Sequence, residues 1–228
     1  VRSFRGIEPR EAPKTFKGTL RDYQQAGLGW FRFLDDFGFG GCLADDMGLG
    51  KTIQVLAMLE ERRTRPKVDG RRAPSLVVAP KSLIFNWMDE AARFTPKLRL
   101  LNLTGTERAD RHGELDRVDV ALTTYGTLRR DIERLKDVRF DYAVLDEAQA
   151  IKNADSQAAK ACRLLQADHR LAMSGTPIEN HLGELWSLFE FLNPGLLGRA
   201  ASFERLTKDG DAAGRALVAR TVAPLMLR

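Results

Sequence analysis

The stretch Gly41–Thr52, which reads GCLADDMGLGKT, decides the fold of this 228-residue chain. Its apolar first part predicts a strand, and an apolar helical pattern follows Thr52. The Gly-rich turn between them offers successive backbone N–H groups, and the start of the next helix adds its dipole, so the two together form an anion-binding nest. Strand, turn and helix in this order predict a site for nucleotide phosphates.

The residue types in this turn fit that chemistry. Gly48 and Gly50 let the backbone approach phosphate oxygens closely, because no Cβ intervenes. Lys51 can reach the β- and γ-phosphates, and the hydroxyl of Thr52 can ligate Mg²⁺. Asp45 stands where the general P-loop template has glycine. The alternative interpretation is a Gly-rich turn with an incidental lysine.

Short apolar runs alternate with helical patterns along most of the chain. Runs that predict strands are Ser75–Ala79, Leu98–Leu103, Val118–Thr123, Tyr142–Leu145 and, more weakly, His169–Met173. Helical patterns cover Leu20–Phe37, Thr52–Arg63, Ser82–Phe94 (with Ser82 as N-cap) and Ser156–Gln166. The alternation predicts an α/β fold with a mainly parallel central sheet and helices on both faces. Ligands of such sheets bind beyond the carboxyl ends of the strands.

Three further segments lie outside this alternation. The first 17 residues are polar and contain Pro9 and Pro13, which predicts an extended arm. Glu61–Arg72 is rich in arginine and predicts an exposed loop, either a plain solvated surface or a contact for DNA phosphates. Asn180–Leu192 is an amphipathic helix, and short helices follow it.

Composition limits the class of protein. The formal net charge is +5 with a pI of about 9.4, which modestly favours anionic partners. The two cysteines lie in apolar contexts and predict reduced core thiols of a cytoplasmic protein. No metal-ligand spacing, signal peptide or run long enough to span a bilayer is visible, so we expect no membrane partner.

Two acids follow the apolar run Tyr142–Leu145. Asp146 at a strand end beside a P-loop can hold Mg²⁺, directly or through water, because this ion keeps several waters and takes few carboxylates. Glu147 would then polarise the attacking water in a hydrolysis reaction. The alternative is an acidic pair that caps the start of a helix.

Taken in order, these segments resemble the Swi/Snf-type ATPases of helicase superfamily two. Segments that carry the resemblance are Leu20–Gln24 (Q motif), Asp45–Gln54 (motif I), Val78–Trp87 (Ia), Leu122–Tyr125 (Ib), Asp146–Gln149 (II, a DEAQ box) and Ser174–Asn180 (III). Leu185–Leu188, Phe191–Pro194 and Pro224–Arg228 extend it, so that it covers nearly the whole chain. Asp45, odd for a general P-loop, is usual in that family, and Gln149 takes the place of a more common histidine.

The resemblance implies a three-layer RecA-like lobe that uses ATP and Mg²⁺. It divides the chain into an arm (1–17), the ATP-binding lobe (18–194) and a helical extension (195–228) that leads toward a second lobe. The expected ATP contacts are Gln24, which would read adenine, and Gly48, Leu49, Gly50, Lys51 and Thr52. Lys81, Ser82, Thr124 and Tyr125 would contact the DNA backbone, and Ser174 and Thr176 would couple DNA to ATP. Trp87 and Trp186 are expected in the core.

The implied activity is that of a double-stranded-DNA-dependent ATPase or translocase that remodels protein–DNA complexes. Arginines from the second lobe would complete the ATP site, so we expect the isolated chain to hydrolyse ATP very slowly. We also expect the isolated chain to be a monomer. Two alternatives stay open at this point. One is a lobe of a strand-separating RNA or DNA helicase, and the other is a nucleotide-binding regulatory module without turnover. The cytoplasm, or the nucleoid of a prokaryote, is the expected location.

Overall fold

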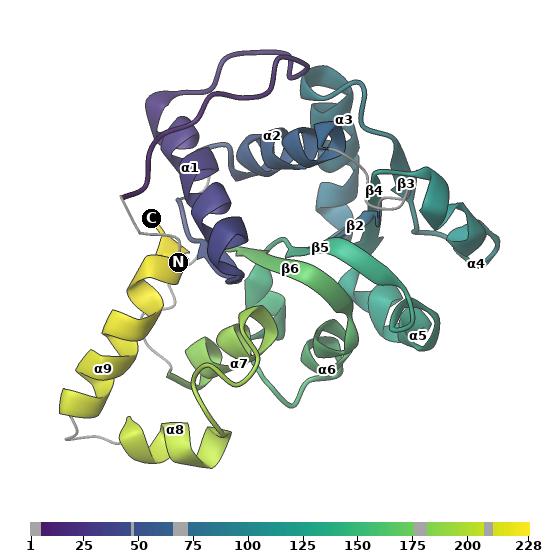
Figure 1. The fold of residues 1–228 in the computed structure, drawn as a ribbon. Helices are drawn as coiled ribbons and strands as arrows, with labels where there is room; N and C mark the ends of the chain where they lie inside the picture. Colours follow the sequence, from purple (N-terminus) through teal and green to yellow (C-terminus); the bar gives the residue numbers. More distant parts are fainter. Residues whose placement is uncertain (1–5, 47, 66–72, 176–181, 208–211) are drawn as a thin grey trace.

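A seven-stranded parallel sheet lies at the centre of the fold (Figure 1). The computed structural model describes residues 6–46, 48–65, 73–175, 182–207 and 212–228. The strands are β1 (Gly41–Leu43), β2 (Ser75–Ala79), β3 (Leu100–Asn102), β4 (Val120–Thr124), β5 (Arg139–Leu145), β6 (Gln166–Met173) and β7 (Met226–Leu227). Their order across the sheet is β3-β4-β2-β5-β6-β1-β7, and the paired strands run parallel.

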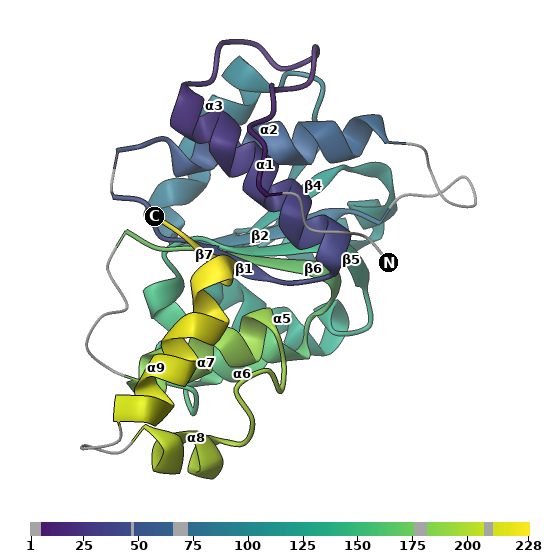
Figure 2. The ribbon, with the colours of Figure 1, turned by 60° about the vertical axis from the view of Figure 1, so that its left-hand side comes forward.

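Helices cover both faces of this sheet, which confirms the predicted three-layer α/β class (Figure 2). One face carries α1 (Asp22–Phe37), α2 (Lys51–Thr64) and α3 (Ile84–Phe94), and the other carries α5 (Tyr125–Leu135), α6 (Gln157–Leu164) and α7 (Leu182–Leu192). Shorter helices are α4 (Arg108–Arg111), α8 (Ala200–Leu206) and α9 (Ala212–Val222), with 3₁₀ turns η1 (Lys81–Leu83), η2 (His112–Arg117), η3 (Ala148–Ile151) and η4 (Ala223–Leu225). Within the described residues, none of these helices is long and apolar enough to cross a membrane.

Burial explains why continuous apolar runs form the strands. All five residues of β2 are buried, because the strand lies inside the sheet and is covered on both faces. Trp30, Trp87, Phe140 and Phe189 are among the largest fully buried side chains. They fill the layers between sheet and helices, so each layer holds aromatic as well as aliphatic packing.

Two sequence predictions are wrong at element boundaries. The helix predicted from Ser82 begins at Ile84 after the turn η1, and no side chain caps it. The helix predicted to reach Gln166 ends at Leu164, and Gln166 already belongs to β6. Main-chain hydrogen bonds decide where these helices begin and end, and a pattern of apolar residues does not show them.

The segment Glu61–Arg72, predicted as an exposed loop, is helical in its first part. Helix α2 continues to Thr64, and residues 66–72 lie outside the described part of the chain. The side chain of Arg62 is only 12% exposed, because it donates to Asp141 and, over 2.9 Å, to Asp35. The helix predicted over Thr52–Arg63 thus ends one residue later, at Thr64, and Arg62, predicted in an exposed loop, is mostly buried.

The extension after residue 194 returns to the sheet. This part of the chain contains α8 and α9, but the sequence did not predict β7, which pairs with β1 through Cys42–Met226 and Leu43–Leu227. The indole of Trp30 in α1 donates to the main-chain oxygen of Pro224 over 2.9 Å. These contacts fix the end of the extension against α1 and the sheet edge.

The N-terminal arm crosses α1 at a glycine. The main chain of Arg10 donates to the oxygen of Gln25 over 2.9 Å, and a Cβ built on Gly29 would lie 2.0 Å from the main-chain oxygen of Glu8. We therefore expect Gly29→Ala to destabilise the fold by about 1–3 kcal/mol, as overpacking does. The measurement is the free energy of unfolding in urea.

A matched control exists in α7. Gly183 has open space around an added Cβ, so Gly183→Ala is expected to be neutral or to stabilise by at most about 1 kcal/mol. Equal stability of the two variants would contradict the close crossing of arm and helix.

A charged cluster joins α1, α2, β5 and β6 at the amino ends of the strands. His169 stacks on Tyr142 with ring centroids 4.8 Å apart, and its Nε2 lies 3.2 Å from Oδ1 of Asp35. Burial lowers the pKa of His169, and the charge of Arg62 lowers it further, although Asp35 opposes both. The imidazole is therefore kept neutral in the folded state at neutral pH.

This lowered pKa predicts a pH dependence of stability. Between the unfolded value of about 6.5 and the lower folded value, the unfolded chain binds more protons, so stability falls as the pH falls through that window. We expect urea midpoints to decrease from pH 7.5 to pH 5.5 in the wild type and to decrease less in His169→Gln. An identical decrease in both proteins would show that His169 does not contribute.

Candidate functional site

The turn between β1 and α2 adopts a conformation that requires its glycines. Gly48 and Gly50 have φ values of 86° and 72°, which favour glycine. A Cβ on Gly50 would also lie 2.7 Å from Nε2 of Gln24. Met47 lies outside the described residues. The turn thus leads directly into the N-terminus of α2, as a phosphate-binding nest requires.

Lys51, the first residue of α2, turns its ammonium back over this turn. Its Nζ donates to the main-chain oxygens of Asp45 and Asp46 over 2.8 and 3.1 Å. An ammonium has three N–H donors, so one remains for a phosphate oxygen. Thr52 follows in the first turn of α2 and is partly exposed.

Asp45, the residue that departs from the general P-loop template, has a structural partner. Its carboxylate, in a residue that is 7% exposed, accepts a hydrogen bond from Nε2 of Gln54 over 3.2 Å. Gln54 is fully buried in α2. The pair ties the start of the turn to the helix that follows it, which accounts for an acid at a position where glycine is usual.

Gln24, predicted to read adenine, lies against the same turn. Its side chain accepts from the main-chain N–H of Arg21 over 3.0 Å and donates to the oxygen of Leu49 over 3.2 Å. The hydroxyl of Tyr23 donates to the same oxygen over 3.0 Å. One amide N–H of Gln24 stays available, so the contact with adenine stays a prediction.

Asp146 follows β5 and is 5% exposed. Its Oδ1 accepts from the main-chain N–H of Glu147 over 2.9 Å, and its Oδ2 accepts from the indole of Trp87 over 2.8 Å. Burial raises the pKa of Asp146 and Glu147 adds to the rise, while the Trp87 bond and Lys51 oppose it. A carboxylate with this environment and the hydroxyl of Thr52 are hard oxygen donors that fit Mg²⁺.

Glu147 has a strained backbone. With φ 49° and ψ 58°, it is the sole non-glycine residue at positive φ among those the structure describes. Its Oε2 accepts from Nε2 of Gln149 over 2.7 Å. Strain of this kind persists where the surroundings enforce it, which is common at functional sites.

The residues predicted to contact DNA divide into two groups. Lys81 and Ser82 are exposed in η1, and the hydroxyl of Ser82 caps no helix. Thr124 and Tyr125 begin α5, where Oγ1 of Thr124 accepts from the N–H of Thr127 over 3.1 Å as the N-cap. The hydroxyl of Tyr125 donates to the main-chain oxygen of Asp146 over 2.8 Å, and burial raises the pKa of this tyrosine.

Ser174 comes directly after β6 and is 2% exposed. Its main-chain N–H donates to the oxygen of Leu43 over 3.1 Å, so it lies beside the strand that leads into the Gly-rich turn. Thr176, the second predicted coupling residue, lies outside the described residues. Apart from Gln24, which lies in α1, the described residues of the predicted site lie at or after the carboxyl ends of strands in one sheet, where the α/β rule places ligands.

Sequence and structure comparisons agree with this geometry. Residues 23–228 match the family described as SNF2-related domain. The chain belongs to the SNF2-related family. It is 42% identical over 94% of its length to the Bacillus subtilis helicase/translocase YwqA, and covers 24% of that protein. It is 40% identical over 88% of its length to the TATA-binding protein-associated factor MOT1 of Saccharomyces cerevisiae, and covers 11% of it.

Solved structures show the same relationship for the SNF2-related fold. The Sulfolobus solfataricus SWI2/SNF2 ATPase core in complex with double-stranded DNA matches with a TM-score of 0.86 and 41% identity. The match covers 99% of this chain and 46% of that one. The core of the same organism described without DNA matches with a TM-score of 0.83 and 39% identity. The chain therefore spans about half of these cores and a quarter or less of the curated relatives described above.

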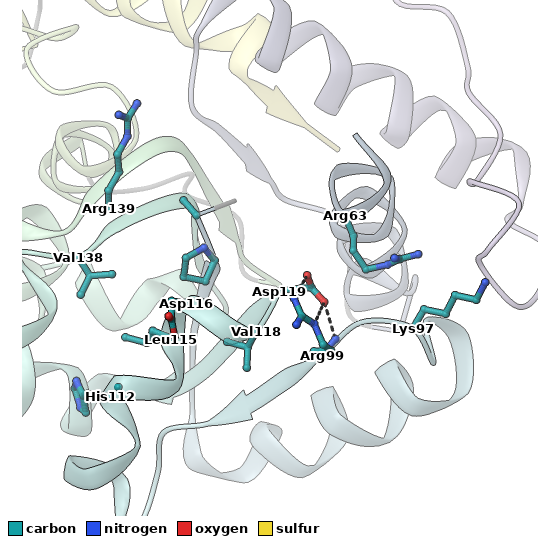
Figure 3. Close-up of a pocket in the computed structure, with 13 residues that line it drawn as sticks. Arg63, Lys97, Arg99, His112, Leu115, Asp116, Val118, Asp119, Val138 and Arg139 are labelled. Atoms are coloured by element: carbon teal, nitrogen blue, oxygen red, sulfur yellow. Dashed lines mark hydrogen bonds and ion pairs between the residues drawn. The ribbon is translucent and has the colours of Figure 1, made fainter. Parts of the chain in front are cut away.

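A different part of this SNF2-related lobe holds a cavity of about 1180 Å³ (Figure 3). It lies near the amino ends of β3, β4 and β5, away from the Gly-rich turn. Four basic side chains line it, but three of them pair with acids: Arg63 with Glu60, Arg99 with Asp119 and Arg139 with Asp168. This cavity therefore lies at the edge of the sheet opposite to the predicted phosphate site.

Sequence reasoning missed three hydrogen bonds of the candidate site residues. It placed Trp87 in the core, which is confirmed by its full burial, but did not foresee the bond to Asp146. It also missed the pairing of Gln54 with Asp45 and of Gln149 with Glu147. A polar residue in the apolar core-facing pattern of α2 was the available signal for Gln54.

The conformation of Glu147 yields a stability prediction. Glycine adopts positive φ without the cost of roughly 1–2 kcal/mol that a Cβ brings, so Glu147→Gly should be more stable than Glu147→Ala by about 1 kcal/mol. Both variants lose the carboxylate and the bond from Gln149, so the difference isolates the backbone. Urea denaturation measures it, and equal stabilities would refute the strain.

Proposed function

We propose that this chain is the ATP-binding lobe of a double-stranded-DNA-dependent ATPase that translocates on DNA and remodels protein–DNA complexes. The observation that carries the proposal is the shared edge of the sheet. The Gly-rich turn, the acids after β5 and the polar starts of η1 and α5 all follow strands that end there. The double-stranded DNA in the similar Sulfolobus solfataricus core supports the choice of nucleic acid.

Phosphate binding is assigned to the turn before α2. Main-chain N–H groups of Gly48, Leu49 and Gly50 would surround the phosphates, and the free N–H of Lys51 would contact the β- and γ-phosphates. Thr52 and Asp146 would hold Mg²⁺, which when bound neutralises charge on the phosphate oxygens. Gln24, beside the turn, would contact adenine.

Hydrolysis is assigned to Glu147. Its carboxylate would orient the attacking water and take its proton, while the amide of Gln149 holds that carboxylate in place. Arginines from a second lobe would stabilise the charge on the transferring phosphoryl group. Such arginines raise turnover by roughly 10³–10⁵-fold in phosphoryl-transfer enzymes.

Contact with DNA is assigned to the backbone of the duplex. The exposed ammonium of Lys81 and hydroxyl of Ser82 would bind phosphates, which positions a protein without reading sequence. Thr124 and Tyr125 lie at the start of α5 near the same edge, with their hydroxyls already bonded within the fold. Ser174 and Thr176 would link this contact to the γ-phosphate.

The test is the ATPase rate of the full-length protein with double-stranded DNA, single-stranded DNA and RNA. We expect the largest stimulation by double-stranded DNA, without strand displacement. Lys51→Ala should lose nucleotide binding, whereas Glu147→Gln should bind nucleotide and lose turnover by at least about 10²-fold, since it removes the general base. The isolated 228-residue chain should hydrolyse ATP very slowly.

Three outcomes would contradict the proposal. Displacement of a paired strand would favour a strand-separating helicase. Unchanged turnover in Glu147→Gln would favour a regulatory nucleotide-binding module. Fast, DNA-stimulated hydrolysis by the isolated chain would show that no second lobe is needed.

A further inference from the structure

Asp146 receives hydrogen bonds from two helices that adjoin the candidate DNA contacts: α3, which follows η1, and α5. From α3, the indole N–H of Trp87 donates to its carboxylate over 2.8 Å. From the start of α5, the hydroxyl of Tyr125 donates to its main-chain oxygen over 2.8 Å. Helices α3 and α5 lie on opposite faces of the sheet, so Asp146 is held from both sides (Figure 2).

The Trp87 bond differs from those of the other tryptophans. Trp30 and Trp186 donate to the main-chain oxygens of Pro224 and Gly198, as a buried or half-buried indole commonly does. Trp87 is fully buried, yet it donates to a carboxylate that is itself 5% exposed. A hydrogen bond to a charged acceptor in such surroundings is stronger and more directional than one to a carbonyl.

The same bonds restrict how the carboxylate can turn. Oδ2 is engaged by Trp87 and Oδ1 by the N–H of Glu147, so one lone pair on each oxygen remains for other ligands. A shift of α3 would move the donor on Oδ2, and a shift of α5 would move the main chain of Asp146. Either movement changes where the remaining lone pairs point.

Short paths connect these donors to the surface. The exposed turn η1 runs directly into α3, and Trp87 lies in the first turn of that helix. Tyr125 is the first residue of α5 and follows the N-cap Thr124. Lys81 and Ser82 are therefore joined to the residue that donates to Asp146 by the end of η1 and the start of α3.

We propose that Trp87 and Tyr125 are positioning residues that couple contact with the DNA backbone to the orientation of Asp146 toward Mg²⁺-nucleotide. This inference rests on the proposed function, and it adds a route separate from Ser174 and Thr176. Coupling of this kind is reciprocal, so nucleotide must change the affinity for DNA by the same factor as DNA changes the affinity for nucleotide.

The test is the dissociation constant for a DNA duplex, measured on the full-length protein with and without Mg²⁺ and a non-hydrolysable ATP analogue. We expect a ratio of about fivefold or more in the wild type. In Trp87→Phe, which keeps an aromatic ring but removes the N–H, the ratio should fall well below the wild-type value. Tyr125→Phe, which removes one oxygen atom, should lower the ratio as well.

Trp30→Phe is the matched control, because it removes a buried indole N–H that bonds a carbonyl in the extension. It should retain the wild-type ratio. A merely structural role of Trp87 would weaken DNA and nucleotide binding separately. For Trp87→Phe the proposal expects each affinity alone to stay within about threefold of the wild type while the ratio falls.

The outcomes separate this inference from the proposed function. A wild-type protein that binds no duplex, or whose ratio is already one, would remove the premise of coupling. A wild type with coupling that both Trp87→Phe and Tyr125→Phe preserve would overturn the inference alone. Should Trp87→Phe fail to fold, as judged by its thermal unfolding, Tyr125→Phe decides the matter.

Discussion

Parallel register in the central sheet is the constraint on which the rest of the structure depends. Leu43 pairs with Met173, Val78 with Leu145 and Ala79 with Thr124, so five strands end near one line. The chain leaves each of these strands into a segment with polar or glycine residues. The sheet thereby collects groups that are far apart in sequence, and hydrogen bonds among them become possible.

Several side chains at this edge form hydrogen bonds with other groups of the fold. Asp45 bonds to the buried Gln54, and Lys51 bonds to carbonyls of its own turn. Glu147 keeps a positive φ while Gln149 binds its carboxylate. A positive φ or a buried charge costs free energy when it has no partner. Here hydrogen bonds from neighbouring groups offset that cost. This supports a site that is formed before ligands arrive.

The opposite edge of the sheet has a different character. There Arg62, Asp35 and Asp141 form a partly buried ion-pair network that joins α1 and α2 to β5, and a cavity of about 1180 Å³ lies close to other paired charges. Paired charges with few free donors favour cohesion between layers over ligand binding. The two edges thus differ, although both are rich in charge: one holds ion pairs between layers and the other holds the candidate site.

The sequence by itself determined the α/β class, the order of the motifs and the residues at the carboxyl edge, because strand and helix periodicity and the chemistry of the Gly-rich turn are local. Three further features follow from tertiary contacts alone: β7 joins the sheet, Ser82 caps no helix and Arg62 is mostly enclosed by its ion pairs. The tertiary structure also decided that Trp87 bonds to Asp146, a residue 59 positions away. Such a bond depends on how α3 packs against the sheet near the end of β5. No pattern of residues within either segment predicts that packing.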